Sequence, residues 1–230
     1  MRKEALDLSF LYNMSKPIGS GTVGSYYGDF NAEEIQKIKD KVGLRSHDTG
    51  IKVTSFKTDA IGENLSLYFI MPYIEEMTNI KTPKPQMPLT LKTLTEEAVF
   101  TQHIKGVHLH KVITDWGARK VAEDITGEHL RYKLRQIGII WTDAHSGNYM
   151  IDPRTSKEKI DNILNPPQPD ESFDFSDYVT IVDVGYFKCG KETPPGKKLT
   201  LLMQKLEAIQ NKRNYGPIYK IINEIENMLK

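Results

Sequence analysis

The stretch ending at Asn148 constrains the fold of this chain more than any other. It reads L-R-Q-I-G-I-I-W-T-D-A-H-S-G-N, which predicts a helix end, a glycine that stops the helix, a short apolar strand and a polar loop. A second apolar strand, Tyr149–Ile151, follows directly, and a third precedes Asp183 in the sequence I-V-D-V-G. Because strands hold the side chains beside them in defined positions, Asp143, Asn148 and Asp183 are the first candidates for a functional site.

The chain divides into a strand-rich part and a helical part, with the boundary near residues 72–78. A length of 230 residues predicts one domain or two small lobes. The net charge of +1 gives no sign of a nucleic-acid-binding protein, and no apolar run reaches the ~18 residues of a transmembrane helix. The single cysteine, Cys189, excludes an internal disulfide and fits a reducing compartment, so we expect a cytoplasmic protein.

The strand-rich part begins with the glycine-rich segment I-G-S-G-T-V-G-S-Y-Y-G. It predicts a strand, a turn and a strand over 17–28, because no long helix starts directly after the glycines, as a dinucleotide site would require. Asn31 predicts the N-cap of a helix over 32–42. The other elements expected in this part are a leading helix at 3–14, strands at 51–57 and 65–71, and an exposed connection over 78–92.

The helical part is expected to contain helices over about 95–110 and 114–137 before the polar loop. Two more helices, over about 197–213 and 217–229, follow later in the chain, and the last carries one apolar stripe. The stretch 153–177 is polar, contains prolines and becomes acidic toward its end. Such a composition between two short strands predicts an exposed insert.

The polar loop has the residue types that phosphoryl transfer requires. That reaction needs little covalent help from a protein, but it needs a positioned nucleophile and compensation of the phosphate charge. An aspartate accepts the hydroxyl proton, and an asparagine and a second aspartate supply the oxygen ligands that Mg²⁺ prefers. Asp143, Asn148 and Asp183 match these roles in type and order. The alternative is a pair of unrelated acidic loops on another α/β protein.

With these motifs, residues 17–190 resemble the protein-kinase-like superfamily, as an atypical member. The loop T-D-A-H-S-G-N is similar to the T-D-P-H-P-G-N form of the ubiquinone-biosynthesis atypical kinases and to the H-G-D-L-H-x-G-N form of small-molecule phosphotransferases. The short length is similar to that of the minimal kinases that some bacterial pathogens inject into the host cytosol. The resemblance implies an α+β, two-lobed protein-kinase-like fold, with a reduced N-lobe over 1–77 and a minimal helical C-lobe over 78–230.

The resemblance also implies a set of site residues for ATP and for Mg²⁺ or Mn²⁺. Asp143 would be the catalytic base, Asn148 and Asp183 the metal ligands, and His145 a hydrogen-bond donor near the γ-phosphate. The glycine-rich loop would cover the phosphates, G-I-K-V nominates a phosphate-binding lysine, and L-Y-F-I-M-P-Y-I-E resembles a hinge that bonds the adenine edge. The nucleotide-binding residues expected from these three segments are Gly19, Ser20, Gly21, Gly24, Lys52, Met71 and Tyr73.

Several features depart from the kinase pattern. Trp141 and Thr142 replace the usual histidine and arginine before Asp143, a long insert precedes the second aspartate, and no A-P-E element follows it. Lys52 lies too close to Met71 to leave room for the usual intervening helix. Each segment therefore keeps a structural alternative: an ordinary glycine hairpin, a solvated lysine, a buried strand, and a histidine that stabilises its own loop.

The function expected first is phosphorylation of a protein hydroxyl, because the chain has few residues to spare for a small-molecule pocket. The alternatives are a small-molecule phosphotransferase, a pseudokinase that binds nucleotide and partners without turnover, and transfer of AMP to a protein. Without the arginine, we expect constitutive activity or activation by a protein partner rather than control by a phosphorylated loop. A basic patch formed by Lys188, Lys191, Lys197 and Lys198 is the expected docking surface. We expect a monomer with no nucleic-acid or membrane partner.

Overall fold

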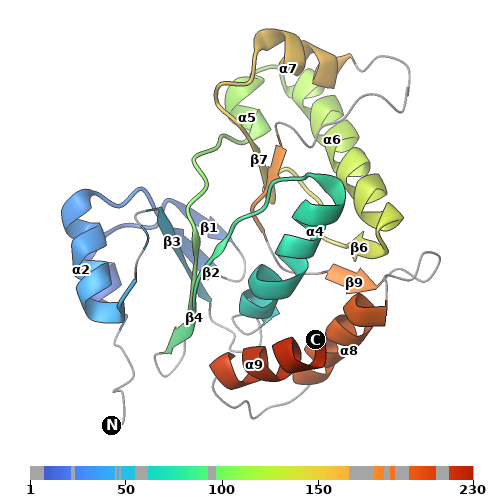
Figure 1. Ribbon diagram of the computed structural model, residues 1–230. Coiled ribbons are helices and arrows are strands. Elements are labelled where there is room, and N and C mark those ends of the chain that lie inside the picture. Colours follow the sequence, from blue (N-terminus) through green and yellow to red (C-terminus); the bar gives the residue numbers. More distant parts are fainter. Residues whose placement is uncertain are drawn as a thin grey trace. The chain divides into compact units, whose positions relative to one another are not determined.

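Figure 1 shows the computed structural model of the chain, which forms two compact units. The structure describes residues 8–21, 24–44, 46, 48–54, 62–92, 97–165, 179–183, 187–189, 197–210 and 218–229. Each unit is assembled from separate stretches of sequence, whereas the sequence analysis placed a single boundary near residue 78. Unit 1 consists of Met1–Phe69, Lys84–Ile104 and Gln204–Lys230, and unit 2 consists of Ile70–Pro83 and Lys105–Met203.

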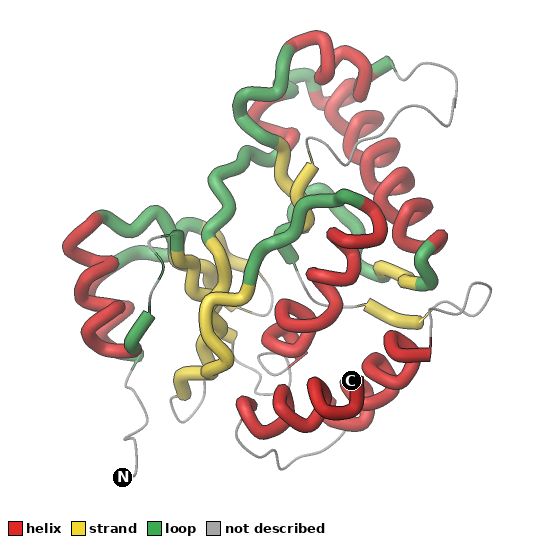
Figure 2. Tube along the Cα trace, in the orientation of Figure 1, coloured by secondary structure: helices red, strands yellow, loops and turns green. Residues whose placement is uncertain are grey.

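Unit 1 is built on a five-stranded antiparallel sheet with the strand order β1-β2-β3-β5-β4 (Figure 2). The strands are β1 (Gly19–Gly21), β2 (Gly24–Tyr27), β3 (Thr49–Thr54), β4 (Pro85–Lys92) and β5 (Glu97–Gln102). β1 and β2 pair with Ser20 opposite Ser25, which confirms the two strands predicted in the glycine-rich segment. β3 confirms the strand predicted at 51–57 over its described part.

Strands β4 and β5 correct two predictions. β4 lies in the segment 78–92, which was expected to be an exposed connection, and β5 lies in 95–110, which was expected to be a helix. β5 pairs with β3 and β4, and all of its first four residues, from Glu97 to Phe100, are buried. A strand buried on both faces loses the alternating pattern and cannot be distinguished from a buried helix by periodicity alone. β4 is at the edge of the sheet, which is where prolines are tolerated in strands.

Two helices pack on one face of this sheet. They are α1 (Ser9–Met14) and α2 (Ala32–Val42). Asn31 is the N-cap of α2, as predicted, and the structure shows that it forms a capping box with Glu34. Leu11 and Ile38 join Ile51 and Phe100 of the sheet in one buried apolar cluster. Because side chains alternate across a strand, the residue after Ile51, which is Lys52, points to the opposite face.

A helical stretch occupies residues 62–78, where the sequence predicted a strand over 65–71. It consists of a helical turn at 62–65, a π-helical segment η1 (Ser66–Ile70) and α4 (Met71–Thr78). Leu65, Ser66 and Met71 are all buried, so the segment shows no polar face by which a helical period could be recognised. The strand prediction is wrong for this reason. Pro72 lies in the first turn of α4, a position where proline is tolerated.

Unit 2 is mainly helical around the long helix α6 (Trp116–Gln136). It packs against α4, against α5 (Leu109–Val112) and against α7 (Lys157–Leu164) (Figure 1). α6 confirms the helix predicted over 114–137, and Gly138 follows it with a φ of 81°. α7 lies inside the predicted insert, of which residues 166–177 are outside the described part of the chain.

Two short antiparallel pairs complete the described part of unit 2. β6 (Ile139–Trp141) pairs with β9 (Phe187–Cys189), and β7 (Tyr149–Ile151) pairs with β8 (Val179–Ile181). The strands predicted before and after the polar loop are therefore confirmed.

The last two helices, α8 (Lys197–Gln210) and α9 (Ile218–Leu229), agree with the helices predicted over 197–213 and 217–229. α9 packs on β4 of unit 1 and buries Ile221, Ile222 and Ile225. Of the helices that the structure describes, none combines the length and the apolar character that a membrane crossing demands. The chain is thus a mixed α+β protein with an antiparallel sheet and several helices.

Candidate functional site

The predicted polar loop connects β6 to β7 in unit 2 and folds around Asp143. The side-chain nitrogen Nδ2 of Asn148 donates to the backbone carbonyl oxygen of Asp143 at 2.7 Å and to its carboxylate Oδ2 at 3.0 Å. Asn148 is buried, whereas the Asp143 side chain is 42% exposed. The loop therefore fixes the carboxylate at one oxygen and leaves it accessible to solvent.

His145 closes the same loop over Gly147. The backbone N–H of Gly147 donates to Nδ1 of His145 at 3.0 Å, so the neutral ring carries its proton on Nε2. Nε2 lies 3.5 Å from Oδ1 of Asp143. A Cβ at position 147 would come within 2.8 Å of the ring carbon Cε1 of His145, so any other residue there would displace the ring from this position. The two oxygens of Asp143 thus face Asn148 and His145.

Side chains from outside the loop hold its backbone. Nη2 of Arg131 on α6 donates to the carbonyl oxygen of Ala144 at 2.7 Å. Nδ1 of His108, just before α5, lies 3.2 Å from the carbonyl oxygen of Ser146 and donates to it. The sequence analysis did not assign these two roles, because Arg131 and His108 approach the loop only through the packing of unit 2.

Tyr149, the first residue after the loop, ties β7 to α6. Its hydroxyl donates to the carbonyl oxygen of Glu123 at 3.1 Å, and its ring is fully buried. Burial raises the pKa of the Tyr149 phenol, with the carboxylates of Glu123 and Asp124 adding to the effect. The phenol therefore remains protonated and keeps this hydrogen bond well above neutral pH.

Asp183 is brought beside the loop by the pairing of β7 with β8. The backbone N–H groups of Val182 and Asp183 lie 2.9 Å and 3.3 Å from the carbonyl oxygen of Asn148. Asp183 follows the end of β8, and Asn148 precedes the start of β7. The structure therefore places the three residues predicted from the loop motifs, Asp143, Asn148 and Asp183, in one region of unit 2.

Asn148 and Asp183 have the donor atoms that suit a divalent cation. Because the amide nitrogen of Asn148 makes both bonds to Asp143, its amide oxygen Oδ1 is available to a hard ion such as Mg²⁺. Within the described residues, no group of three or more His, Cys, Asp and Glu side chains could hold a metal by itself. Mg²⁺ commonly completes its coordination with phosphate oxygens and water, so two protein ligands fit such an ion.

Unit 1 contains an ion pair that the sequence analysis did not identify. Nζ of Lys52 on β3 lies 2.6 Å from Oε1 of Glu63 in the helical turn 62–65. The two side chains are 24% and 9% exposed, so both charges are largely shielded from water. The sequence analysis found no room for a helix between Lys52 and Met71, because it assigned 65–71 to a strand. In the structure, residues 65–71 belong instead to the helical stretch 62–78, which also contains Glu63.

The glycine-rich segment forms the β1–β2 hairpin of the same sheet, and its turn, residues 22–23, lies outside the described residues. A Cβ at Gly24 would overlap the carbonyl oxygen of Val53 on β3, so packing between strands requires this glycine. A Cβ at Gly19 would meet no atom within 4 Å. Ser20 and Gly21 lie on the same edge strand, β1.

Met71 and Tyr73 do not form the predicted hinge. Both lie in α4, where backbone N–H and C=O groups bond within the helix. Met71 is fully buried, and its carbonyl oxygen also accepts a bond from Oγ1 of Thr82 at 3.3 Å. The Tyr73 hydroxyl donates to the carbonyl oxygen of Ile137 at 3.4 Å. Neither residue offers the extended backbone edge that a hinge would present to adenine.

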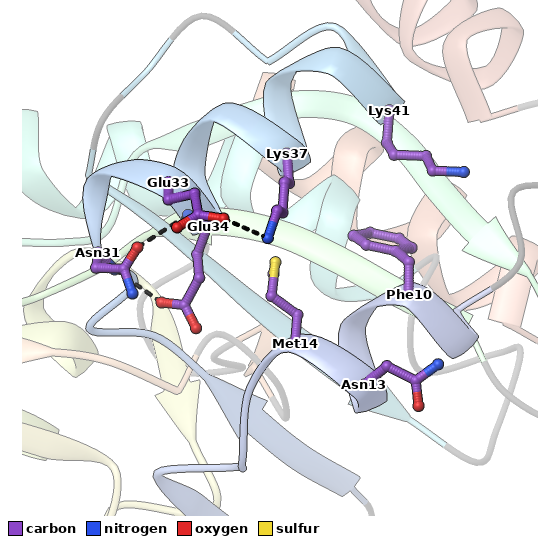
Figure 3. Close-up of a pocket in the computed structure, with 8 residues that line it drawn as sticks. All are labelled: Phe10, Asn13, Met14, Asn31, Glu33, Glu34, Lys37 and Lys41. Carbon is purple, nitrogen blue, oxygen red and sulfur yellow. Dashed lines mark hydrogen bonds and ion pairs between the residues drawn. The ribbon is translucent and has the colours of Figure 1, made fainter.

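A separate pocket of about 450 Å³ lies between α1 and α2 in unit 1 (Figure 3). Its charged groups serve α2: Glu33 and Lys37 pair at 2.7 Å, and Glu34 completes the capping box with Asn31. Because α1 and α2 pack on the face of the sheet opposite to Lys52, this pocket is not part of the candidate site. The lining residues are Phe10, Asn13, Met14, Asn31, Glu33, Glu34, Lys37 and Lys41.

The comparisons with known proteins found similarity to solved structures. No protein-family model matches the chain, and no curated protein matches it in sequence. One of the matching structures is the crystal structure of a BubR1 kinase domain, with a TM-score of 0.38 and 13% sequence identity. The similarity covers 86% of this chain and 58% of that chain, so this chain spans less than two thirds of its length.

Proposed function

We propose that the chain is an ATP- and divalent-metal-dependent phosphotransferase with a protein-kinase-like fold. The observation that carries the proposal is the ion pair between Lys52 on β3 and Glu63 in the helix that follows. In protein kinases, a lysine of the third strand pairs with a glutamate of the next helix and holds the nucleotide phosphates. This pair played no part in the reading of the loop motif, so two independent sets of residues support the same activity.

The residues of unit 2 supply the remaining roles. Asp143 would accept the proton of the attacking hydroxyl, because its carboxylate is exposed and Asn148 holds it at one oxygen. Asn148 and Asp183 would hold Mg²⁺ or Mn²⁺. When bound, this ion would neutralise part of the phosphate charge. We assign His145 to positioning Asp143, since its Nδ1 accepts from Gly147 and its Nε2 faces Oδ1 of Asp143.

We further propose a hydroxyl group of a protein as the acceptor and the cytoplasm as the location. The exposure of the Asp143 carboxylate supports a large acceptor such as a protein, and the single cysteine supports a reducing compartment. A partner that docks on the basic patch is part of the same proposal. Of that patch, Lys191 lies outside the described residues, and Lys197 and Lys198 begin α8.

The test is incubation of the purified chain with γ-labelled ATP and Mg²⁺ or Mn²⁺, alone and with casein as a general protein acceptor. We expect Asp143→Asn to retain ATP binding and to lower the transfer rate at least about a hundredfold, as loss of a general base does. Asp183→Ala should also weaken ATP binding in the presence of the metal. Asp124→Asn, on the outer face of α6 where the aspartate pairs with Lys120, is the matched control and should behave as wild type.

Three results would count against this assignment. An Asp143→Asn variant as active as wild type would remove Asp143 from the mechanism. ATP affinity that is the same with and without a chelator would exclude the metal. Metal-dependent ATP binding with no label on any acceptor would identify a pseudokinase instead.

A further inference from the structure

Gly127 lies in the middle of α6, a position that is unfavourable for glycine. It is buried within this helix of 21 residues. Glycine in a helix interior is less favourable than alanine, because it loses more backbone freedom on folding. Helix formation therefore gives no reason for a glycine here. A close approach by another segment, which leaves no space for a side chain, does give one.

The segment that approaches Gly127 is the loop around Asp143. A Cβ at position 127 would lie 3.3 Å from the carbonyl oxygen of Ala144, which is closer than an ordinary van der Waals contact. Nη2 of Arg131, one turn further along α6, donates to the same oxygen at 2.7 Å. Residues four apart lie on one face of a helix. Gly127 and Arg131 therefore form one binding place for the Ala144 carbonyl, which we call the α6 cradle.

The Ala144 carbonyl belongs to a peptide group that is also bonded to Asp143. A peptide group is planar, so the carbonyl of Ala144 and the N–H of His145 point in opposite directions from one rigid plane. That N–H donates to the carbonyl oxygen of Asp143 at 3.0 Å. The side chain of His145 also places Nε2 at 3.5 Å from Oδ1 of Asp143. By holding one edge of this plane, Arg131 fixes the edge from which both contacts with Asp143 start.

Arg131 is suited to this task by its guanidinium group. The group carries several N–H donors in one plane, so it can serve two acceptors at once. Nη1 pairs with the carboxylate of Glu128 on the same helix, while Nη2 reaches Ala144. The side chain of Glu128 is 66% exposed, and exposed ion pairs contribute little to stability. The bond from the charged donor to the loop is therefore the stronger reason for an arginine at this position.

We propose that the α6 cradle positions the catalytic base: Arg131 and Gly127 act on Asp143 through the peptide group of Ala144. This inference rests on the proposed function, in which Asp143 accepts the proton of the attacking hydroxyl. The Asp143 side chain is 42% exposed, so much of its surroundings is solvent, and the loop backbone must define where the carboxylate lies. Small displacements of a reacting group are costly in rate, whereas the nucleotide is held by other residues.

The experiment measures two properties of each variant. One is the rate of transfer from γ-labelled ATP to casein, and the other is hydrogen exchange at the backbone N–H of Asn148, which donates to the His145 carbonyl at 2.9 Å within the loop. Arg131→Met should lower kcat about tenfold or more and leave the KM for ATP within about twofold. Exchange at Asn148 should become about tenfold faster, the factor expected for loss of a charged hydrogen bond. Exchange at Leu130, within α6, should stay unchanged.

Three variants separate the bond to the loop from the other contacts of α6. Arg131→Lys keeps one cationic donor and should recover part of both losses. Glu128→Gln removes the ion pair but leaves the bond to Ala144, so it should behave as wild type. Arg119→Met is the matched control, because Arg119 lies on the same helix, pairs with Glu123 and is 27% exposed, against 30% for Arg131. It should change neither measurement.

Two further variants distinguish positioning from a purely structural role. Gly127→Ala favours the helix but presses on the Ala144 carbonyl, so we expect kcat to fall about fivefold without a lower unfolding temperature. In an Asp143→Asn background there is no base to position, so Arg131→Met should lower kcat no further. Thermal unfolding checks that each variant is folded, and Arg131→Lys and Gly127→Ala decide the question if Arg131→Met is not.

An Arg131→Met variant that transfers phosphate as fast as wild type would overturn the proposal. Equal losses in Arg131→Met and Glu128→Gln would also overturn it, as would a further loss from Arg131→Met in the Asp143→Asn background. Failure of the proposed function gives a different pattern. Wild type itself would then transfer no label, while Arg131→Met would still speed exchange at Asn148. The cradle would order the loop without serving a base, and its positioning role would fail together with the function.

Discussion

At the scale of single residues, one glycine sets the geometry around Asp143. Gly147 lets the ring of His145 lie against the loop backbone and accept its N–H at Nδ1. The same ring then places Nε2 beside Asp143. Asp143, His145 and Gly147 therefore form one connected unit within the loop.

Gly147→Ala tests this unit. The added methyl group would displace the His145 ring, and we expect the rate of phosphoryl transfer to fall about tenfold, because small displacements of reacting groups are costly. ATP affinity should change little. In a His145→Ala background the same substitution has no ring to displace, so the two effects should be strongly non-additive, with a coupling of about 1 kcal/mol.

The matched control is Gly117→Ala in the first turn of α6, where a Cβ would meet only an ordinary contact with Asp115 at 3.5 Å. If Gly147→Ala lowers the rate of phosphoryl transfer equally with and without the His145 ring, the glycine serves the backbone alone.

At the scale of elements, the ion pair between Lys52 and Glu63 joins β3 to the helical stretch 62–78. The low exposure of Glu63 means that its charge is poorly solvated, so the pair contributes to how these two elements pack. Removing one partner of such a pair costs more than removing both, because the charge that remains is buried.

We expect Lys52→Met to lower the free energy of unfolding by about 2 kcal/mol, less than for a fully buried pair because Lys52 is partly exposed. The double variant Lys52→Met/Glu63→Met should recover part of this loss. Urea denaturation measures the free energy of unfolding of the single and the double variant. Lys37→Met, in the exposed pair with Glu33 on α2, should have only a small effect. This account would be contradicted if the double variant lost more free energy of unfolding than the two single variants lose in total.

At the scale of the whole molecule, the candidate residues are divided between two units that are each discontinuous in sequence. Lys52 belongs to unit 1, and Asp183 belongs to unit 2. The proposed function assigns a role in nucleotide binding to each of these residues, so stabilisation by the ligand tests each assignment separately.

Mg²⁺-ATP at about a hundred times its Kd should stabilise wild type by about 2.7 kcal/mol, because it binds only the folded chain. Lys52→Met and Asp183→Asn should each remove most of this stabilisation, as measured by the shift in unfolding temperature with ligand. Lys120→Met, which breaks an exposed ion pair on α6, should retain the stabilisation by Mg²⁺-ATP. If only one of the two substitutions removes the stabilisation, the role assigned to the other residue is wrong, and the phosphotransferase proposal fails.

The sequence by itself determined the features that depend on neighbouring residues. The capping box at Asn31, the glycine hairpin of β1 and β2, the end of α6 before Gly138 and the loop around Asp143 all follow from local turn and hydrogen-bond chemistry. Such chemistry acts over a few residues, so it can be read directly from the order of amino acids.

The tertiary structure alone decided the elements that are buried on more than one side. β5 and the stretch 62–78 are both short apolar runs, and burial on both faces removes the polar pattern that distinguishes strand from helix. The contacts of Lys52 with Glu63 and of Arg131 with Ala144 join segments whose approach depends on how those elements pack. Because that packing is set by the whole core, no local pattern specified these partners.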